Sequence, residues 1–202
     1  MTIIKKQNKN QQKTYDVQHG QSIELLKELH ILTRDGKLNQ DSRRKLKQVY
    51  HLYQFIEPLL ASDNNSSITL VDHGASKSYL GFIIYDLFTN VAKQNGLYVY
   101  GIETRDELVA KSQQLAKLAG FTAMQFLHLS VADSISSELL PDKVNVVTAL
   151  HACNTATDDA IDFALTKDAD NIVLVPCCQA EVAAVLRKNK SKLLADIALG
   201  EM

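Results

Sequence analysis

Short apolar segments alternate with helical patterns from residue 68 onward, and this alternation limits the possible folds more than any other feature of the chain. Five segments have the length and character of buried strands: Ile68–Val71, Leu97–Ile102, Met124–Leu129, Val144–Leu150 and Asn171–Val175. Helical periodicity separates or follows them at Tyr79–Ala92, Glu107–Ala119, Thr157–Leu165 and Ala180–Leu199. Strands joined through helices pair in parallel, and the helices cover both faces of the sheet. The pattern therefore predicts an α/β fold.

The residues before the first strand have a different character. Residues 1–19 are polar and rich in Gln and Asn, which predicts a flexible tail. Residues 20–63 are predicted to form an N-terminal helical segment, with stripes at Ser22–Thr33 and Ser42–Ala61, and residues 64–202 the α/β domain. The apolar positions expected to face inward on the longer helix are Leu46, Val49, Leu52, Tyr53, Phe55, Ile56, Leu59 and Leu60.

The longer helix opens with a strongly basic turn, formed by Arg43, Arg44, Lys45 and Lys47. This turn is either a solvated helix face or a contact for a substrate or phosphate. The formal net charge of -1 gives no overall attraction for nucleic acid, so RNA binding would depend on such a local patch.

Composition narrows the cellular setting. No run approaches the ~20 apolar residues that span a membrane, and the N-terminus lacks the apolar core of a secretory signal. The three cysteines, two of them adjacent, make a poor disulfide framework. We expect a cytoplasmic protein with no membrane association.

The loop after the first strand is the place to look for a ligand, because open parallel sheets bind ligands at the carboxyl ends of their strands. This loop, Asp72–Leu80, begins with an acidic residue and small residues that let a ligand approach the backbone. Glu103 ends the second strand, where a carboxylate suits two ribose hydroxyls. Asp133, beyond the third strand, is either a contact for the adenine edge or a helix cap. The order of these features predicts nucleotide-type binding.

Three segments carry a resemblance to a known family. VDHGASKSYLGF, beginning at Val71, resembles the DxGxGKGYL motif of a class I S-adenosylmethionine (SAM) dependent methyltransferase family. That family includes bacterial proteins and relatives of methyltransferase-like protein 25. LHACNTATDDAI, from Leu150, is similar to its HACDTATD motif, and VPCCQAE, from Val175, to its PCC motif. The basic helix RRKLKQVYHLYQFIE also resembles the segment before the family's core.

The resemblance implies a Rossmann-like methyltransferase sheet with an N-terminal helical extension, and SAM as cofactor. It places Asp72, Gly74, Ser76, Lys77 and Tyr79 in the cofactor loop, with Glu103 on the ribose and His151 as a further cofactor contact. It also places His151, Asn154 and Asp158 as the catalytic candidates between cofactor and acceptor. The implied reaction is methyl transfer to an unidentified acceptor, and the basic N-terminal helix favours RNA or protein over a small molecule as that acceptor.

Three positions depart from the family pattern. Ser76 and Ser78 replace loop glycines, and a Cβ at a position of positive φ costs roughly 1 kcal/mol and crowds a ligand. Asn154 replaces an aspartate, and an amide cannot act as a general base. A catalytically degenerate domain that serves in binding or assembly is therefore the alternative, with an NAD-type oxidoreductase a third reading.

Two further expectations concern the C-terminal part. The sheet of this fold usually has a terminal antiparallel hairpin, and only five strands are predicted here, so we expect either that the sequence is a fragment of a longer protein or that a second copy or a partner chain covers the edge at Asn171–Val175. The ends of the fourth and fifth strands bring His151, Cys153, Cys177 and Cys178 toward each other. These side chains are either packed thiols near a substrate pocket or zinc ligands, and we predict no metal.

Overall fold

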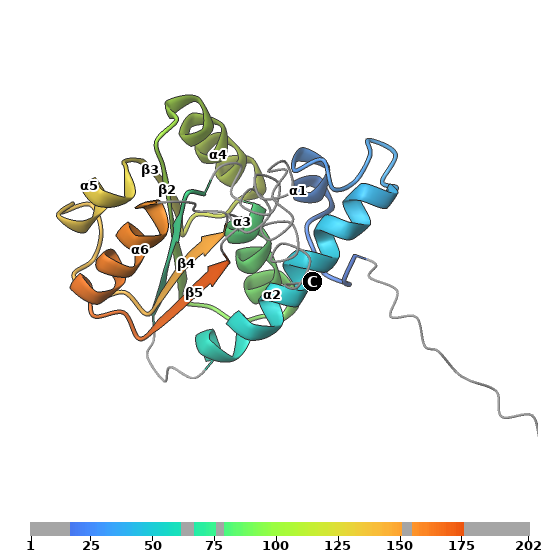
Figure 1. The fold of residues 1–202 in the computed structure, drawn as a ribbon. Helices are drawn as coiled ribbons and strands as arrows, with labels where there is room; N and C mark the ends of the chain where they lie inside the picture. Colours follow the sequence, from blue (N-terminus) through green and yellow to red (C-terminus); the bar gives the residue numbers. More distant parts are fainter. Residues whose placement is uncertain (1–16, 62–66, 76–78, 151–154, 176–202) are drawn as a thin grey trace, which may run out of the picture.

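A parallel sheet forms the centre of the molecule. The computed structural model describes residues 17–61, 67–75, 79–150 and 155–175 (Figure 1). In these residues the strands lie in the order β3-β2-β1-β4-β5, and every pair is parallel. They are β1 (Ile68–His73), β2 (Leu97–Glu103), β3 (Met124–His128), β4 (Val146–Leu150) and β5 (Asn171–Val175). The predicted α/β, Rossmann-like fold is confirmed.

Helices cover both faces of the sheet. Figure 1 shows α5 (Val131–Ile135) and α6 (Thr155–Thr166) on one side. The other side carries α3 (Tyr79–Asp86), α4 (Asp106–Ala119) and the N-terminal helices α1 (Ile23–Glu28) and α2 (Gln40–Ala61). From β1 the chain runs outward through β2 to β3, and it then returns to form β4 on the other side of β1, followed by β5. The strand order therefore reverses between β1 and β4, which are neighbours. Ligands of such sheets bind outside the carboxyl ends of the strands near this point.

The N-terminal helices share the core of the sheet. Side chains from α1 and α2, such as Leu26 and Leu46, belong to one buried cluster with Leu70 of β1 and Val99 of β2. Both helical predictions are correct in kind, but α1 ends at Glu28 rather than Thr33 because the chain turns at His30, which has a φ of 55°. Phe55, expected to face inward, is 59% exposed, so the apolar stripe of α2 is narrower than predicted.

A buried polar network fixes the N-terminal segment to the end of α3. Asp86 is fully buried, and its carboxylate accepts hydrogen bonds from the backbone N–H of Ser22, the Gln21 amide and the Asn90 amide. The Tyr50 hydroxyl of α2 donates to Oε1 of the Gln21 side chain. The chain then continues as a π-helix, η1 (Leu87–Val91), instead of the uninterrupted α-helix that periodicity predicts to Ala92.

Other boundaries move by a few residues. β4 begins at Val146 rather than Val144, and β1 and β2 run on to include His73 and Glu103. The short α5 was not predicted, because one helical turn has no detectable periodicity. The predicted helix at Ala180–Leu199 lies outside the described residues. None of the helices in the described part combines the length and apolar character that a membrane crossing needs.

Candidate functional site

A cavity of about 500 Å³ lies at the carboxyl ends of β1, β2 and β4. Its volume falls in the range of small-molecule sites, roughly 300–1,000 Å³. Of the predicted cofactor residues, Asp72, Gly74, Tyr79 and Glu103 all line it. Residues that lie up to 31 positions apart in the sequence therefore meet at one site.

Asp72 is the most buried polar group of this cavity. It lies in register between Gly101 of β2 and Thr148 of β4, and only 2% of its surface is exposed. Its carboxylate accepts hydrogen bonds from the Thr148 hydroxyl, at 2.7 Å, and from the backbone N–H of Gly81. Burial nevertheless raises its pKa from 3.8 to about 6, because desolvation penalises the charged form more than these bonds favour it. The cavity therefore holds a carboxylate that gains from a cationic ligand.

The backbone that follows Asp72 is shaped by small residues. Gly74 has a φ of 63° and is exposed to the cavity, a conformation that costs an L-residue roughly 1 kcal/mol. The N–H of Ala75 donates to the carbonyl of Ile102, which ties the turn to β2. These two residues leave the backbone open to a ligand.

Gly101 is a supporting residue that sequence reasoning missed. A Cβ built there would lie 2.5 Å from Cδ1 of Phe126 and 3.4 Å from the Cβ of Ala75. Only glycine therefore lets β2 pass between the Phe126 ring and the turn under the cavity. The signal was a glycine inside an otherwise apolar strand.

Glu103 is the last residue of β2 and is held in an ion pair. Its side chain is 6% exposed, and its two oxygens accept from Nε and Nη2 of Arg105, at 2.9 and 3.0 Å. The backbone N–H of Arg105 and the hydroxyl of Thr104 also donate to Oε1. Arg105 itself lines the cavity and was not predicted. A ligand hydroxyl that binds Glu103 must take the place of this guanidinium.

The remaining wall of the cavity is apolar. It consists of side chains that follow the strand ends, Leu80, Ile102, Leu129, Val131, Leu150 and Ala156. A carboxylate on one side and a flat apolar wall on the other suit a ligand with a polar sugar-like part and an aromatic part.

Two predicted residues lie apart from this cavity lining. Asp133 is exposed in the first turn of α5, where its Oδ2 accepts from the hydroxyl of Ser130, the N-cap residue, and its N–H donates to that hydroxyl oxygen. Asp158 is exposed in the first turn of α6, two residues beyond the lining residue Ala156. Neither is among the residues that line the cavity.

Several predicted residues lie outside the described part of the chain. These are Ser76, Lys77, Ser78, His151, Cys153, Asn154, Cys177 and Cys178. Within the described residues, no group of three or more His, Cys, Asp or Glu side chains converges on a metal position.

His73, next to Asp72, faces away from the cavity. It is fully buried, its ring lies edge-on to Phe163 with centroids 4.5 Å apart, and burial lowers its pKa to about 4. The Ser134 hydroxyl donates to the carbonyl of Val131, so Nε2 of His73 must donate to that hydroxyl. His73 is therefore a neutral core residue, and its Nδ1 has no partner among the described residues.

The fold and the cavity define a Rossmann-like α/β protein with its site at the strand ends. Residues 44–185 match the family model described as a methyltransferase domain, which is more than half of the chain. The chain belongs to this methyltransferase domain family. A search of curated protein sequences found no match.

Solved structures resemble the chain at low identity. An rRNA methylase from Streptococcus thermophilus is 12% identical, with 65% of this chain and 76% of that chain covered and a TM-score of 0.46. The YcgJ protein from Bacillus subtilis is 13% identical, with 68% and 59% covered and a TM-score of 0.46. The N-terminal domain of EvdMO1, solved with SAH bound, is 14% identical, with 62% and 48% covered and a TM-score of 0.43. The chain thus spans 48% to 76% of the length of these three.

Proposed function

We propose that this domain binds SAM in the cavity at the strand ends and transfers its methyl group to an acceptor. One observation carries the proposal: two buried carboxylates, those of Asp72 and Glu103, line one cavity of about 500 Å³ at the ends of adjacent strands. Membership of the methyltransferase domain family supports it. Buried carboxylates are costly unless a ligand or partner compensates them, so they mark a binding site.

Each part of the cavity has a role in this proposal. Asp72 faces the cationic amino group of the cofactor, and Glu103 accepts hydrogen bonds from the two ribose hydroxyls once Arg105 has moved. The apolar wall formed by Ile102, Leu129 and Val131 takes the adenine. Bound SAM supplies an electrophilic methyl group on its sulfonium. The chain orients this group and keeps water away from it, which is most of the work in an in-line displacement.

The finer assignments from the motifs belong to the same proposal. We infer that Ser76 and Lys77 complete the cofactor loop, and that His151, Asn154 and Asp158 lie near the methyl acceptor. The likeness of the three motifs to the relatives of methyltransferase-like protein 25 supports this inference, and a cytoplasmic location is part of it.

Calorimetric titration with SAM and S-adenosylhomocysteine tests the proposal. We expect micromolar binding by the wild-type chain and at least roughly tenfold weaker binding by Glu103→Ala, because two hydrogen bonds to a carboxylate are lost. Glu138→Ala, an exposed carboxylate outside the cavity, is the matched control and should bind as the wild type does. No binding at millimolar ligand would reject the cofactor assignment and favour a domain that serves in assembly.

A further inference from the structure

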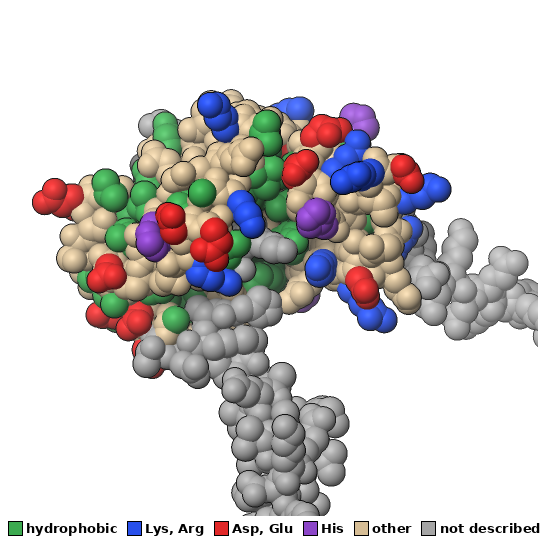
Figure 2. Space-filling model, turned by 90° about the horizontal axis from the view of Figure 1, so that it is seen from above, with side chains coloured by type: hydrophobic (Ala, Val, Ile, Leu, Met, Phe, Trp, Pro, Cys, Tyr) green, Lys and Arg blue, Asp and Glu red, His purple; other side chains and the backbone are tan. Residues whose placement is uncertain are grey.

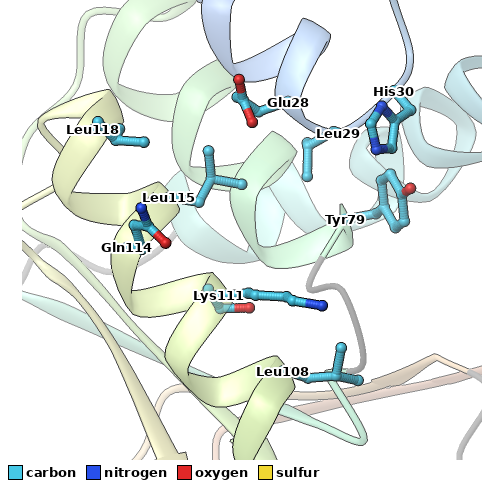
Figure 3. Close-up of a pocket in the computed structure, with 10 residues that line it drawn as sticks. Glu28, Leu29, His30, Tyr79, Leu108, Lys111, Gln114, Leu115 and Leu118 are labelled. Carbon is cyan, nitrogen blue, oxygen red and sulfur yellow. The ribbon is translucent and has the colours of Figure 1, made fainter.

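A second cavity, of about 350 Å³, adjoins the first. Figure 3 shows it as a groove between the end of α1, the start of α3 and the length of α4. Tyr79 lines both cavities, so one side chain separates the groove from the strand-end site. A ligand that lies in the groove therefore ends beside the cofactor cavity.

The wall that α1 contributes is held in place by hydrogen bonds. The N–H groups of Ile31 and Leu32 both donate to the carbonyl of Leu26, and the Ser42 hydroxyl of α2 lies 3.4 Å from the carbonyl of His30. His30 itself has a φ of 55°, a conformation that a non-glycine residue keeps only where its surroundings enforce it. The groove is thus preformed, as binding sites usually are.

Four leucines lie among polar side chains along the groove, and one lysine reaches into it. Leu29, Leu108, Leu115 and Leu118 line it, and Leu118 is 70% exposed. In Figure 3 the Lys111 side chain reaches from α4 across the groove, and no carboxylate pairs with it among the described residues. The ammonium of Lys45, in the basic turn of α2, lies 5.7 Å from the centroid of the Tyr79 ring. Among the described residues, Glu28 is the one carboxylate that lines the groove.

The surrounding surface is weakly basic. Figure 2 shows Lys and Arg side chains interspersed with Asp and Glu over α1 and α2, where residues 17–61 hold seven Lys and Arg against five Asp and Glu, whereas residues 131–166, which include α5 and α6, hold six Asp and Glu against one Lys. An anionic partner is therefore attracted to the side on which the groove opens.

We propose that this groove holds the methyl acceptor, a protein segment with acidic residues next to leucine-sized apolar ones. This inference rests on the proposed function, because the groove directs such a segment to the cofactor cavity. The apolar side chains enter between the leucines, and the carboxylates meet Lys111 and Lys45. RNA fits less well, because bases stack on an open aromatic face and the ammonium of Lys45 already lies over the Tyr79 ring.

Fluorescence anisotropy tests the groove with two probes, a short labelled peptide of repeated Glu-Leu-Leu units and a labelled oligouridine of equal net charge. We expect the full chain to bind the peptide, and Lys111→Glu to weaken this binding roughly fivefold or more. Lys117→Glu, the same change on α4 but outside the groove, is the matched control. Leu118→Ser should weaken the peptide as well, whereas Leu139→Ser, equally exposed and outside the groove, should not.

The two sets of variants separate the outcomes. Equal losses with Lys111→Glu and Lys117→Glu would mean that only overall charge matters, which overturns the groove. Tighter binding of oligouridine that depends on Lys111 would overturn the protein acceptor in favour of RNA, and no peptide binding would overturn it outright. SAM binding by Lys111→Glu should stay unchanged, since Lys111 does not line the cofactor cavity. If SAM binds to none of the variants but the peptide does, the proposed function fails while the groove stands.

Discussion

At the scale of single residues, Asp72 combines a cost in stability with a gain in binding. Its pKa is raised from 3.8 to about 6 by burial, a difference that corresponds to about 3 kcal/mol. Below about pH 4 both the folded and the unfolded chain hold the proton. Between these values only the folded state keeps it, so the stability of the folded chain falls as pH rises from about 4 to 6. Evolution tolerates such a cost chiefly at sites of function.

The substitution Asp72→Asn separates the two effects. We expect the variant to be about 1–2 kcal/mol more stable than the wild type at neutral pH, since an amide carries no charge to desolvate. The gain should vanish below about pH 4, and SAM should bind roughly tenfold more weakly because the partner of its amino group is gone. Urea unfolding at several pH values and calorimetry measure the two quantities. A variant less stable than the wild type at neutral pH would show that the Thr148 and Gly81 hydrogen bonds outweigh desolvation.

Arg105 competes with the cofactor for the Glu103 carboxylate. Its guanidinium bonds to both oxygens but is 54% exposed, so the pair contributes about 1 kcal/mol or less. Removing it in Arg105→Ala should therefore tighten SAM binding by only about threefold to fivefold, while Arg105→Lys should fall between. Arg34→Ala, an exposed arginine outside the cavity, is the calorimetric control. Weaker binding by Arg105→Ala would instead make Arg105 a direct contact of the cofactor.

At the scale of elements, the Asp86 network decides where the N-terminal segment lies. Three donors from two segments converge on one buried carboxylate at the junction of α3 and η1. Asp86→Ala should destabilise the chain by about 3 kcal/mol, because the buried donors of Ser22 and Gln21 lose their acceptor. Asn90→Ala removes one donor from the rim of the same network and should cost about 1 kcal/mol. Urea unfolding compares the two, and equal costs would contradict the central place of Asp86.

An element could be predicted from the sequence where local contacts form it, and could not where contacts between distant residues do. Strand positions and the edge acids Asp72 and Glu103 were predictable, because burial on both faces of a parallel sheet leaves a local apolar run followed by polar residues. Two features depend on contacts far apart in sequence and were not predictable: the π-helix beyond Asp86 and the narrow stripe that exposes Phe55. The pairing of Arg105 with Glu103 joins residues only two positions apart, but it depends on the turn after β2, which no pattern in the sequence specifies. Leu118 and Lys111 likewise have the pattern of an ordinary helix surface in the sequence, because they line a groove only where α1 lies beside α4.

At the scale of the whole molecule, we predict that another chain pairs with the edge of the sheet at β5. In the described residues β5 pairs with β4, and Ile172 is 38% exposed. An exposed strand edge invites pairing with another chain. We expect light scattering to show self-association that rises with protein concentration. A monomer at high concentration would contradict it.

The shared core predicts that the N-terminal helices and the sheet unfold together. Leu46 of α2 and Leu70 of β1 are both fully buried in one cluster, although the sequence separates a helical segment from the α/β domain at residue 63. Leu46→Ala and Leu70→Ala should each cost about 2–5 kcal/mol and should shift the same single unfolding transition. Native-state hydrogen exchange checks this, because the slowest amides of α2 and β1 should report the same free energy in the wild type and fall by the same amount in either variant. Leu139→Ala, which is 64% exposed, should change neither. Loss of protection confined to α2 in Leu46→Ala would mean that the helices form a separate unit docked on the sheet.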